Sequence, residues 1–302
     1  MRWLADGSAG AVVEALREVG LGDLPVVVRE SVGGDPTWWS ASAVVGGRYV
    51  VKFAWSEPAA LRLAHEIDVL DALGREPAVS YLPEVVASST DPLLLVTALA
   101  PGESLFEIVD SVDRDEAGRQ LAQFMAELHE AGERLPEAPD ASLQPATTAV
   151  LREQFPKWAR ADQCAEVIRW CDWAADVLRS PGPQVLVHGD LHGGNQLWDG
   201  GKLRAVVDFE TAGLADAEYD LRTFPGPGMG PGVELLTATM RHYAQITGRE
   251  LSVERVMAWH LRTALGDALW RSEAGVPLPD HRTAAEWVDD LADRFTALGI
   301  SC

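Results

Sequence analysis

Two short apolar runs bracket a polar loop in the second half of the chain, and this arrangement restricts most strongly how the chain can fold. The first run, residues 185–187, leads into residues 188–195, which read HGDLHGGN. The second run, residues 203–207, is followed by DFE at residues 208–210. Such β-branched runs predict two strands, each of which delivers polar groups at its carboxyl end.

The acids and the amide of this stretch have the spacing that phosphoryl transfer needs. Asp190 lies five residues before Asn195, and Asp208 follows at the end of the next predicted strand. One carboxylate can orient or accept the proton of a hydroxyl, while an amide oxygen and a second carboxylate hold Mg²⁺ against phosphates. The alternative is a Gly/His turn with exposed acids. Composition favours the chemistry, because Asn195 is the only Asn of the chain and Lys52 is one of three Lys.

The stretch resembles the aminoglycoside phosphotransferase family, small-molecule kinases built on the protein-kinase fold. The family loop H-G-D-x-x-x-x-N is present without a gap from His188 to Asn195, and its D-[FW]-[EGD] metal motif is DFE at 208–210. The family's trailing A-G-x-G-D-P-x-Y-D-L-A corresponds to residues 212–222. Three positions there depart from the usual Gly, Pro and Ala, and we expect them to shape the backbone without affecting the chemistry: Ala215, Ala217 and Arg222.

The resemblance implies an α+β, protein-kinase-like bilobal fold. The N-lobe would be residues 1–97 and would consist of an antiparallel sheet and a helix. This lobe would bind the nucleotide phosphates. Residues 98–102 would be the hinge, and residues 103–302 a mostly helical C-lobe with the catalytic loop and acceptor site. Residue patterns predict strands at 24–30, 37–45, 48–53, 81–88 and 92–97, and helices at 8–19, 56–73, 116–130, 147–155, 161–180, 233–247, 253–274 and 284–298.

Lys52 ends the third predicted strand, and Glu66 lies fourteen residues later, beside the apolar stripe of the next predicted helix. An unpaired carboxylate there would be costly to bury. We therefore expect a Lys52–Glu66 ion pair, in which Lys52 reaches the α- and β-phosphates of a nucleotide. The rival partner, Asp68, is two positions off that face.

The remaining nucleotide contacts follow from the resemblance. The loop after the first strand would cover the phosphates, although a Gly-Gly turn also joins ordinary hairpins; its candidate contacts are Ser31, Gly33 and Gly34. At the hinge, Ala98 C=O and Ala100 N–H would hold the base, with Thr97 facing the base pocket. Thr97 is small, so both ATP and GTP stay open as donors.

Residue roles in the catalytic loop follow the family pattern. Asp190 would be the base or orienting group, and Asn195 and Asp208 the Mg²⁺ ligands. His188 would brace the loop, and Asp220 would fix its backbone. A solvated Asp at a helix end is the alternative for Asp220.

Composition restricts the partners. A net charge of −21 argues against nucleic acid and anionic membranes. The acidic excess is spread nearly evenly along the chain, so it does not identify a substrate. No apolar run approaches transmembrane length and no signal peptide is evident, so we expect a cytoplasmic protein. We expect it to be a monomer or a dimer.

The hypothesis is therefore Mg²⁺-dependent transfer of the γ-phosphoryl of ATP or GTP to a hydroxyl of a small molecule. The resemblance favours an antibiotic acceptor: an aminoglycoside, nucleoside, macrolide or peptide. A metabolic kinase for a sugar, homoserine or another small alcohol is the first alternative, and a nucleotide-binding pseudokinase scaffold is the second. No A-P-E follows the DFE, which disfavours a protein kinase. The Gly/Pro-rich run at residues 224–232 is predicted as a loop, either a rim of the acceptor site or a linker.

Overall fold

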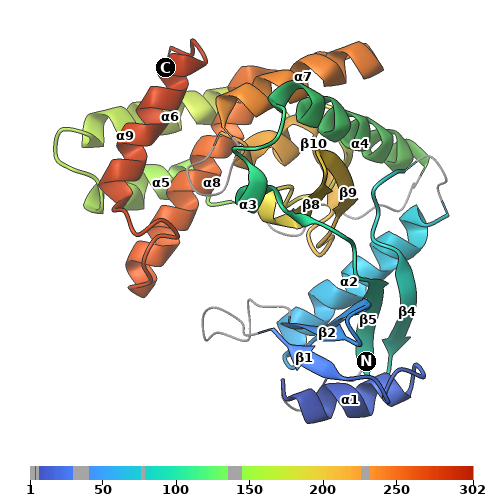
Figure 1. The fold of residues 1–302 in the computed structure, drawn as a ribbon. Coiled ribbons are helices and arrows are strands. Elements are labelled where there is room, and N and C mark those ends of the chain that lie inside the picture. The colour runs from blue at the N-terminus through green and yellow to red at the C-terminus, as the bar shows by residue number, and fades with distance from the viewer. Residues whose placement is uncertain are drawn as a thin grey trace.

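The chain folds into two lobes, one built on a five-stranded sheet and the other mostly helical (Figure 1). The computed structural model describes residues 4, 7–29, 41–75, 79–134, 145–225 and 232–301. The predicted phosphate loop with Ser31, Gly33 and Gly34, and most of the predicted loop at 224–232, lie outside the described residues. The lobe boundaries at 97 and 103 stay a prediction.

The first lobe is an antiparallel sheet in the order β1-β2-β3-β5-β4. The hairpin between β2 and β3 closes at Gly46 and Gly47, both with positive φ, which glycine adopts without steric cost. Strand β3 pairs antiparallel with β5, so Lys52, near the end of β3, lies opposite Leu95. Ala98, the last residue of β5, lies opposite Tyr49. Its strands are β1 (Val26–Val28), β2 (Ala41–Val45), β3 (Tyr49–Phe53), β4 (Val85–Thr90) and β5 (Leu93–Ala98).

Two helices cover opposite faces of this sheet. Helix α1 (Ala9–Arg17) starts at the N-cap Ser8, and α2 (Glu57–Leu73) starts at Ser56, whose side chain accepts a hydrogen bond from Ala59 N–H. Successive side chains of β5 alternate between the two faces. Leu94 and Val96 pack in the cluster with α1, whereas Leu93 and Leu95 pack in the cluster with α2.

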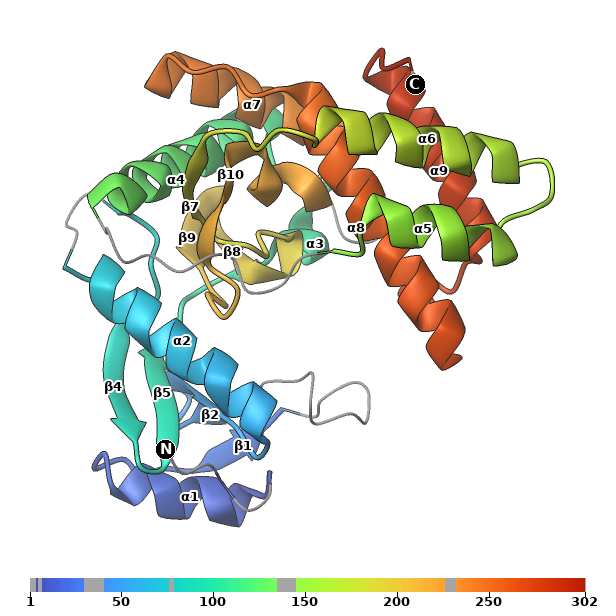
Figure 2. The same cartoon turned by 180° about the vertical axis from the view of Figure 1, so that it is seen from behind.

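The second lobe combines two small sheets with two groups of helices (Figure 2). Helices α4 (Arg114–Arg134) and α7 (Val233–Thr247) pack on each other and share one core with α2, while α5, α6, α8 and α9 form a second core. The other helices are α3 (Leu105–Ile108), α5 (Thr148–Gln154), α6 (Cys164–Val177), α8 (Val253–Ala274) and α9 (Ala284–Ala297). The small sheets are β7 (Gln184–Val187) with β10 (Gly213–Asp216), and β6 (Glu103–Ser104), β8 (Gln196–Asp199) and β9 (Lys202–Val206).

The two predicted strands around the polar loop are β7 and β9. A 3₁₀ segment, η3 (Ala217–Thr223), follows β10 and packs on α8. Among the described residues, none of the helices is both long and apolar enough to cross a membrane.

Candidate active site

A cavity of about 540 Å³ lies between the two lobes. The structure brings eight of the predicted site residues to its wall: Lys52, Glu66, Thr97, Ala98, Ala100, Asp190, Asn195 and Asp208. His188 and Asp220 lie behind this wall, fully buried. The roles of these residues remain proposals, but their positions define one site.

Lys52 lies at the centre of the acidic side of the cavity. Its Nζ donates to Glu66 Oε1 and Oε2 at 2.9 and 2.7 Å and to Asp208 Oδ1 at 2.8 Å. Burial alone lowers the pKa of Lys52, but the carboxylates of Asp208 and Glu66 raise it above its ordinary value. The rival Asp68 is exposed. Lys52 is therefore a fixed cation that links β3, α2 and the end of β9.

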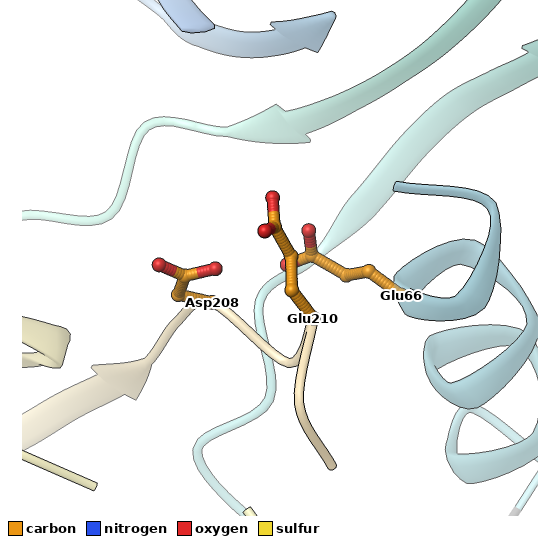
Figure 3. A group of neighbouring side chains, drawn as sticks. All are labelled: Glu66, Asp208 and Glu210. Carbon is orange, nitrogen blue, oxygen red and sulfur yellow. The ribbon is translucent and has the colours of Figure 1, made fainter. Parts of the chain in front are cut away.

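Glu210 is a neighbour that the sequence did not single out, although it is the third residue of the DFE motif. Ligand oxygens of Glu66, Asp208 and Glu210 lie within 4.8 Å of one another (Figure 3). Burial, together with the other two carboxylates, raises the pKa of Glu210 to about 7, against the opposing charges of Lys52 and Arg62. Carboxylate oxygens at this spacing suit a hard divalent cation.

Asp208 adopts a backbone conformation that is uncommon for a residue with a side chain. Its φ is 74°, in the left-handed region. The preceding residue is held on both sides, because Val207 N–H donates to Asn195 O at 2.9 Å and Val207 O accepts from His188 Nε2 at 3.0 Å. Strained conformations of this kind persist where the surroundings fix them, often at functional sites. Here the chain turns sharply at the residue that contacts Lys52.

The Asp220 carboxylate fixes the backbone of the two residues before Asp190. Asp220 Oδ2 accepts from His188 N–H at 2.9 Å, and Oδ1 accepts from Gly189 N–H at 2.8 Å. Burial raises the pKa of the Asp220 carboxyl to about 6, although these two bonds oppose the change. The predicted alternative, a solvated Asp at a helix end, is contradicted, because Asp220 is fully buried.

His188 packs inside the loop as a neutral side chain. Its Nδ1 accepts from Asp190 N–H at 3.2 Å, so the proton lies on Nε2, which donates to Val207 O. Burial lowers the pKa of His188 to about 4, and its ring lies edge-on against Phe209 at 4.5 Å between centroids. His188 therefore bridges the catalytic loop and the strand that leads to Asp208.

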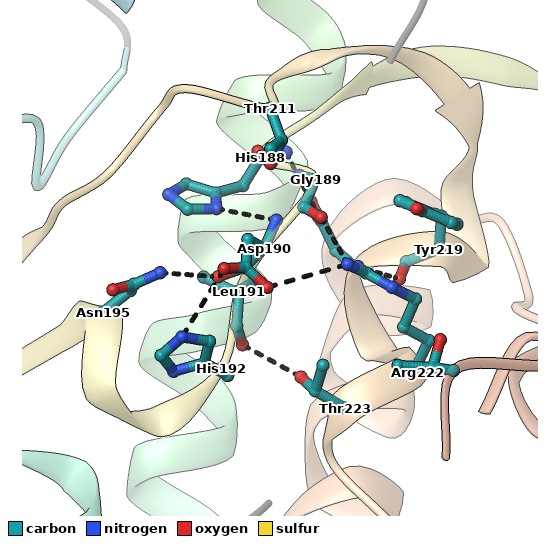
Figure 4. A network of polar contacts seen from close by, with 12 residues as sticks. His188, Gly189, Asp190, Leu191, His192, Asn195, Thr211, Tyr219, Arg222 and Thr223 are labelled. Atoms are coloured by element: carbon teal, nitrogen blue, oxygen red, sulfur yellow. Dashed lines mark hydrogen bonds and ion pairs between the residues drawn. The ribbon is translucent and has the colours of Figure 1, made fainter. Parts of the chain in front are cut away.

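Asp190 projects into the network shown in Figure 4. Its Oδ2 lies 3.5 Å from His192 Nε2, and its Oδ1 lies 3.7 Å from Arg222 Nη2. Asn195 Nδ2 donates to Asp190 O at 2.9 Å, which directs the amide oxygen of Asn195 away from this bond. Arg222, expected to shape the backbone, also extends its side chain to the catalytic loop.

Arg222 also lines a second cavity, of about 270 Å³. Its wall comes from η3, α8 and the segment before α5: Pro145, Ala146, Tyr219, Arg222, Thr263, Gly266 and Asp267. Asp190 lines the first cavity and lies 3.7 Å from Arg222, which lines the second, so this pair lies between the two cavities.

Comparison with known proteins gives consistent matches. A family model described as the phosphotransferase enzyme family matches residues 31–252. The viomycin phosphotransferase of Streptomyces vinaceus is 36% identical over 212 residues, which cover 64% of this chain and 71% of that protein. The family match confirms the resemblance drawn from the loop motifs.

Solved structures of similar fold extend over nearly the whole chain. The GDP complex of aminoglycoside 2'-phosphotransferase-IIIa matches with a TM-score of 0.70 and 18% identity, covering 96% of this chain and 100% of that one. A macrolide 2'-phosphotransferase from Brachybacterium faecium matches with a TM-score of 0.61 and 23% identity, covering 92% and 98%. These likenesses confirm the predicted fold class.

Proposed function

The chain belongs to the phosphotransferase enzyme family, whose members phosphorylate hydroxyl groups, and from this premise we propose that its acceptor is an antibiotic and its donor ATP or GTP. One observation carries the chemistry. Lys52, Asp190, Asn195 and Asp208 line a single cavity between the lobes. Phosphoryl transfer relies on positioning and charge neutralisation, and these four side chains supply both.

The donor side of the cavity fits a nucleotide with a divalent cation. Thr97, Ala98 and Ala100 would face the base, and Lys52 would bind the phosphates. Asn195 and Asp208 offer an amide and a carboxylate oxygen, which are the ligands that Mg²⁺ prefers. When bound, Mg²⁺ neutralises charge on the β- and γ-phosphate oxygens.

Asp190 would act on the acceptor. Its carboxylate, which lines the cavity between the lobes, would accept or orient the proton of the attacking hydroxyl. The relative named for viomycin supports an antibiotic acceptor, with a peptide antibiotic as the first compound to try. The similar structures named for aminoglycosides and a macrolide add these two classes, and a nucleoside antibiotic stays an option from the sequence.

The test is acceptor phosphorylation by the purified protein. Mg²⁺-ATP and Mg²⁺-GTP are supplied in separate reactions with viomycin, an aminoglycoside, a macrolide, a nucleoside antibiotic, a sugar and homoserine. Mass spectrometry follows the gain of one phosphoryl group. We expect an antibiotic to be modified only when Mg²⁺ is present, and Asp208→Asn to lose turnover. Modification of only the sugar or homoserine would make the protein a metabolic kinase, and nucleotide binding without any transfer would make it a pseudokinase scaffold.

A further inference from the structure

Arg222 holds the residue that precedes Asp190. Arg222 Nη2 donates to Gly189 O at 2.6 Å and lies 3.7 Å from Asp190 Oδ1. The same guanidinium is itself fixed, because Nη1 donates to Tyr219 O at 3.2 Å and the group lies 4.0 Å from the centroid of the Tyr219 ring. Figure 4 shows the guanidinium reaching from η3 to the loop.

Both polar backbone groups of Gly189 are thus bound by one short segment. Asp220 accepts from Gly189 N–H, and Arg222, two residues later, donates to Gly189 O. Gly189 has a φ of 83°, which glycine adopts without steric cost, so contacts to its N–H and C=O fix the direction of the peptide plane between Gly189 and Asp190. Arg222 is the side chain that binds the carbonyl of this plane.

The charges around Asp190 also indicate that Arg222 holds this residue in place. Asp190 has a cationic or potentially cationic group near each carboxylate oxygen, Arg222 on one side and His192 on the other. Arg222 is buried, with 7% of its surface exposed, whereas the Asp190 side chain is 37% exposed. The buried cation is therefore the fixed member of the pair, and the carboxylate is the member open to a ligand.

We propose that Arg222 is a positioning residue for phosphoryl transfer, which orients the Gly189–Asp190 peptide and the Asp190 carboxylate toward the acceptor hydroxyl. This inference rests on the proposed function, in which Asp190 acts on that hydroxyl. Arg222 also lines the second cavity, so an acceptor held there would contact the guanidinium that holds Asp190.

A matched control is available in Arg255. Its side chain is 15% exposed, donates to two backbone carbonyls, Val177 O at 3.0 Å and Ser180 O at 3.1 Å, and pairs with Asp216 and Glu218. Like Arg222, it has a buried Nε without a hydrogen-bond partner among the described residues. Among the described residues, Arg255 makes no hydrogen bond or ion pair with residues 188–195, so Arg255→Met removes comparable interactions in the same lobe without touching the loop around Asp190.

The experiment compares Arg222→Met, Arg222→Lys and Arg255→Met with the native protein, at a temperature where all remain folded. We expect Arg222→Met to lower kcat by about 10²-fold, the loss typical of a misplaced reacting group, with nucleotide KM unchanged. Arg222→Lys keeps the charge without the fork of donors and recovers only part of the rate. Free guanidinium, below concentrations that unfold the protein, should restore part of the kcat of Arg222→Met.

Hydrogen exchange of the segment 186–192 supplies a second readout that needs no acceptor. It should be faster in Arg222→Met and unchanged in Arg255→Met. A kcat of Arg222→Met near that of the native protein, or unchanged exchange in this segment, would overturn the proposal. If the native protein phosphorylates no acceptor while exchange still responds to Arg222→Met, the proposed function fails and the hold of Arg222 on the loop stands.

Discussion

Lys52 Nζ lies 2.8 Å from Asp208 Oδ1, so the cation at the end of β3 pairs directly with the carboxylate that we assign to the metal. The pair joins the sheet of the first lobe to the end of β9 in the second. Glu66 strengthens the link, because it contacts Lys52 and also accepts from Phe209 N–H at 3.1 Å. The proposed nucleotide site is therefore held together by ion pairs between the lobes.

The first prediction concerns the cost of removing this cation. Lys52→Met leaves Glu66, which is only 2% exposed, as a buried carboxylate without its partner. We expect a loss of about 3 kcal/mol in the free energy of unfolding, as found when one member of a buried pair is removed. Lys52→Met/Glu66→Gln should recover part of the loss, because Gln removes the charge. Urea unfolding measures the free energy of unfolding of the single and the double variant. A double variant no more stable than Lys52→Met would contradict the explanation that the unpaired Glu66 charge causes the loss.

Local signals predict both ends of α7 and α8, whereas α4, predicted at 116–130, spans Arg114–Arg134. Helices α7 and α8 end where the sequence predicts, because Gly248 and Gly275 adopt the left-handed conformation that terminates helices, with φ of 71° and 68°. The start of α6 is predicted at residue 161, but the helix begins at Cys164. The Gln163 side chain accepts from Arg160 N–H and donates to Ala285 O. The second bond is a tertiary contact at the start of α6, which the spacing of apolar residues cannot predict.

Residues of the candidate site can be predicted from the sequence when a buried charge needs an opposite charge and that partner lies close in the chain. A carboxylate in an apolar stripe needs a cation, so Glu66 points to Lys52. Glu210 and Arg222 are harder to predict, because the bond from Arg62 to Glu210 spans 148 residues and that from Arg222 to Gly189 spans 33. Only the folded chain shows that η3 returns to the loop beside Asp190.

The second prediction separates catalysis from binding. Asp190→Asn removes the carboxylate that would take or orient the hydroxyl proton, and we expect kcat to fall by about 10²–10⁴-fold. Nucleotide affinity should change by no more than a few-fold, because Lys52, Asn195 and Asp208 remain. Steady-state kinetics and nucleotide titration measure the two quantities. Asp199→Asn, at an exposed acid in the same lobe, serves as the control and should keep native turnover.

The third prediction compares two glycines with positive φ. A Cβ at Gly189 would lie 2.2 Å from Thr211 O, whereas a Cβ at Gly200, with φ of 57°, would meet no atom within 4 Å. Gly200→Ala should cost about 1 kcal/mol of strain in the free energy of unfolding and leave turnover intact. Gly189→Ala should cost more and abolish turnover, because the loop backbone must shift. Equal losses in the two variants would mean that the close approach to Thr211 has no consequence.

The fourth prediction follows from the buried Asp220. Burial raises its pKa to about 6 in the folded protein, above the ordinary value near 4 of the unfolded chain. Between these values the folded state binds more protons, so the contribution of Asp220 to the free energy of unfolding falls as pH rises from about 4 to about 7. The fall is about 3 kcal/mol, at 1.36 kcal/mol per unit. Asp220→Asn cannot titrate, so the stability advantage of the native protein over this variant, measured by urea unfolding, should shrink by that amount across this range. An advantage that stays constant or grows with pH would show that the folded-state pKa is not raised.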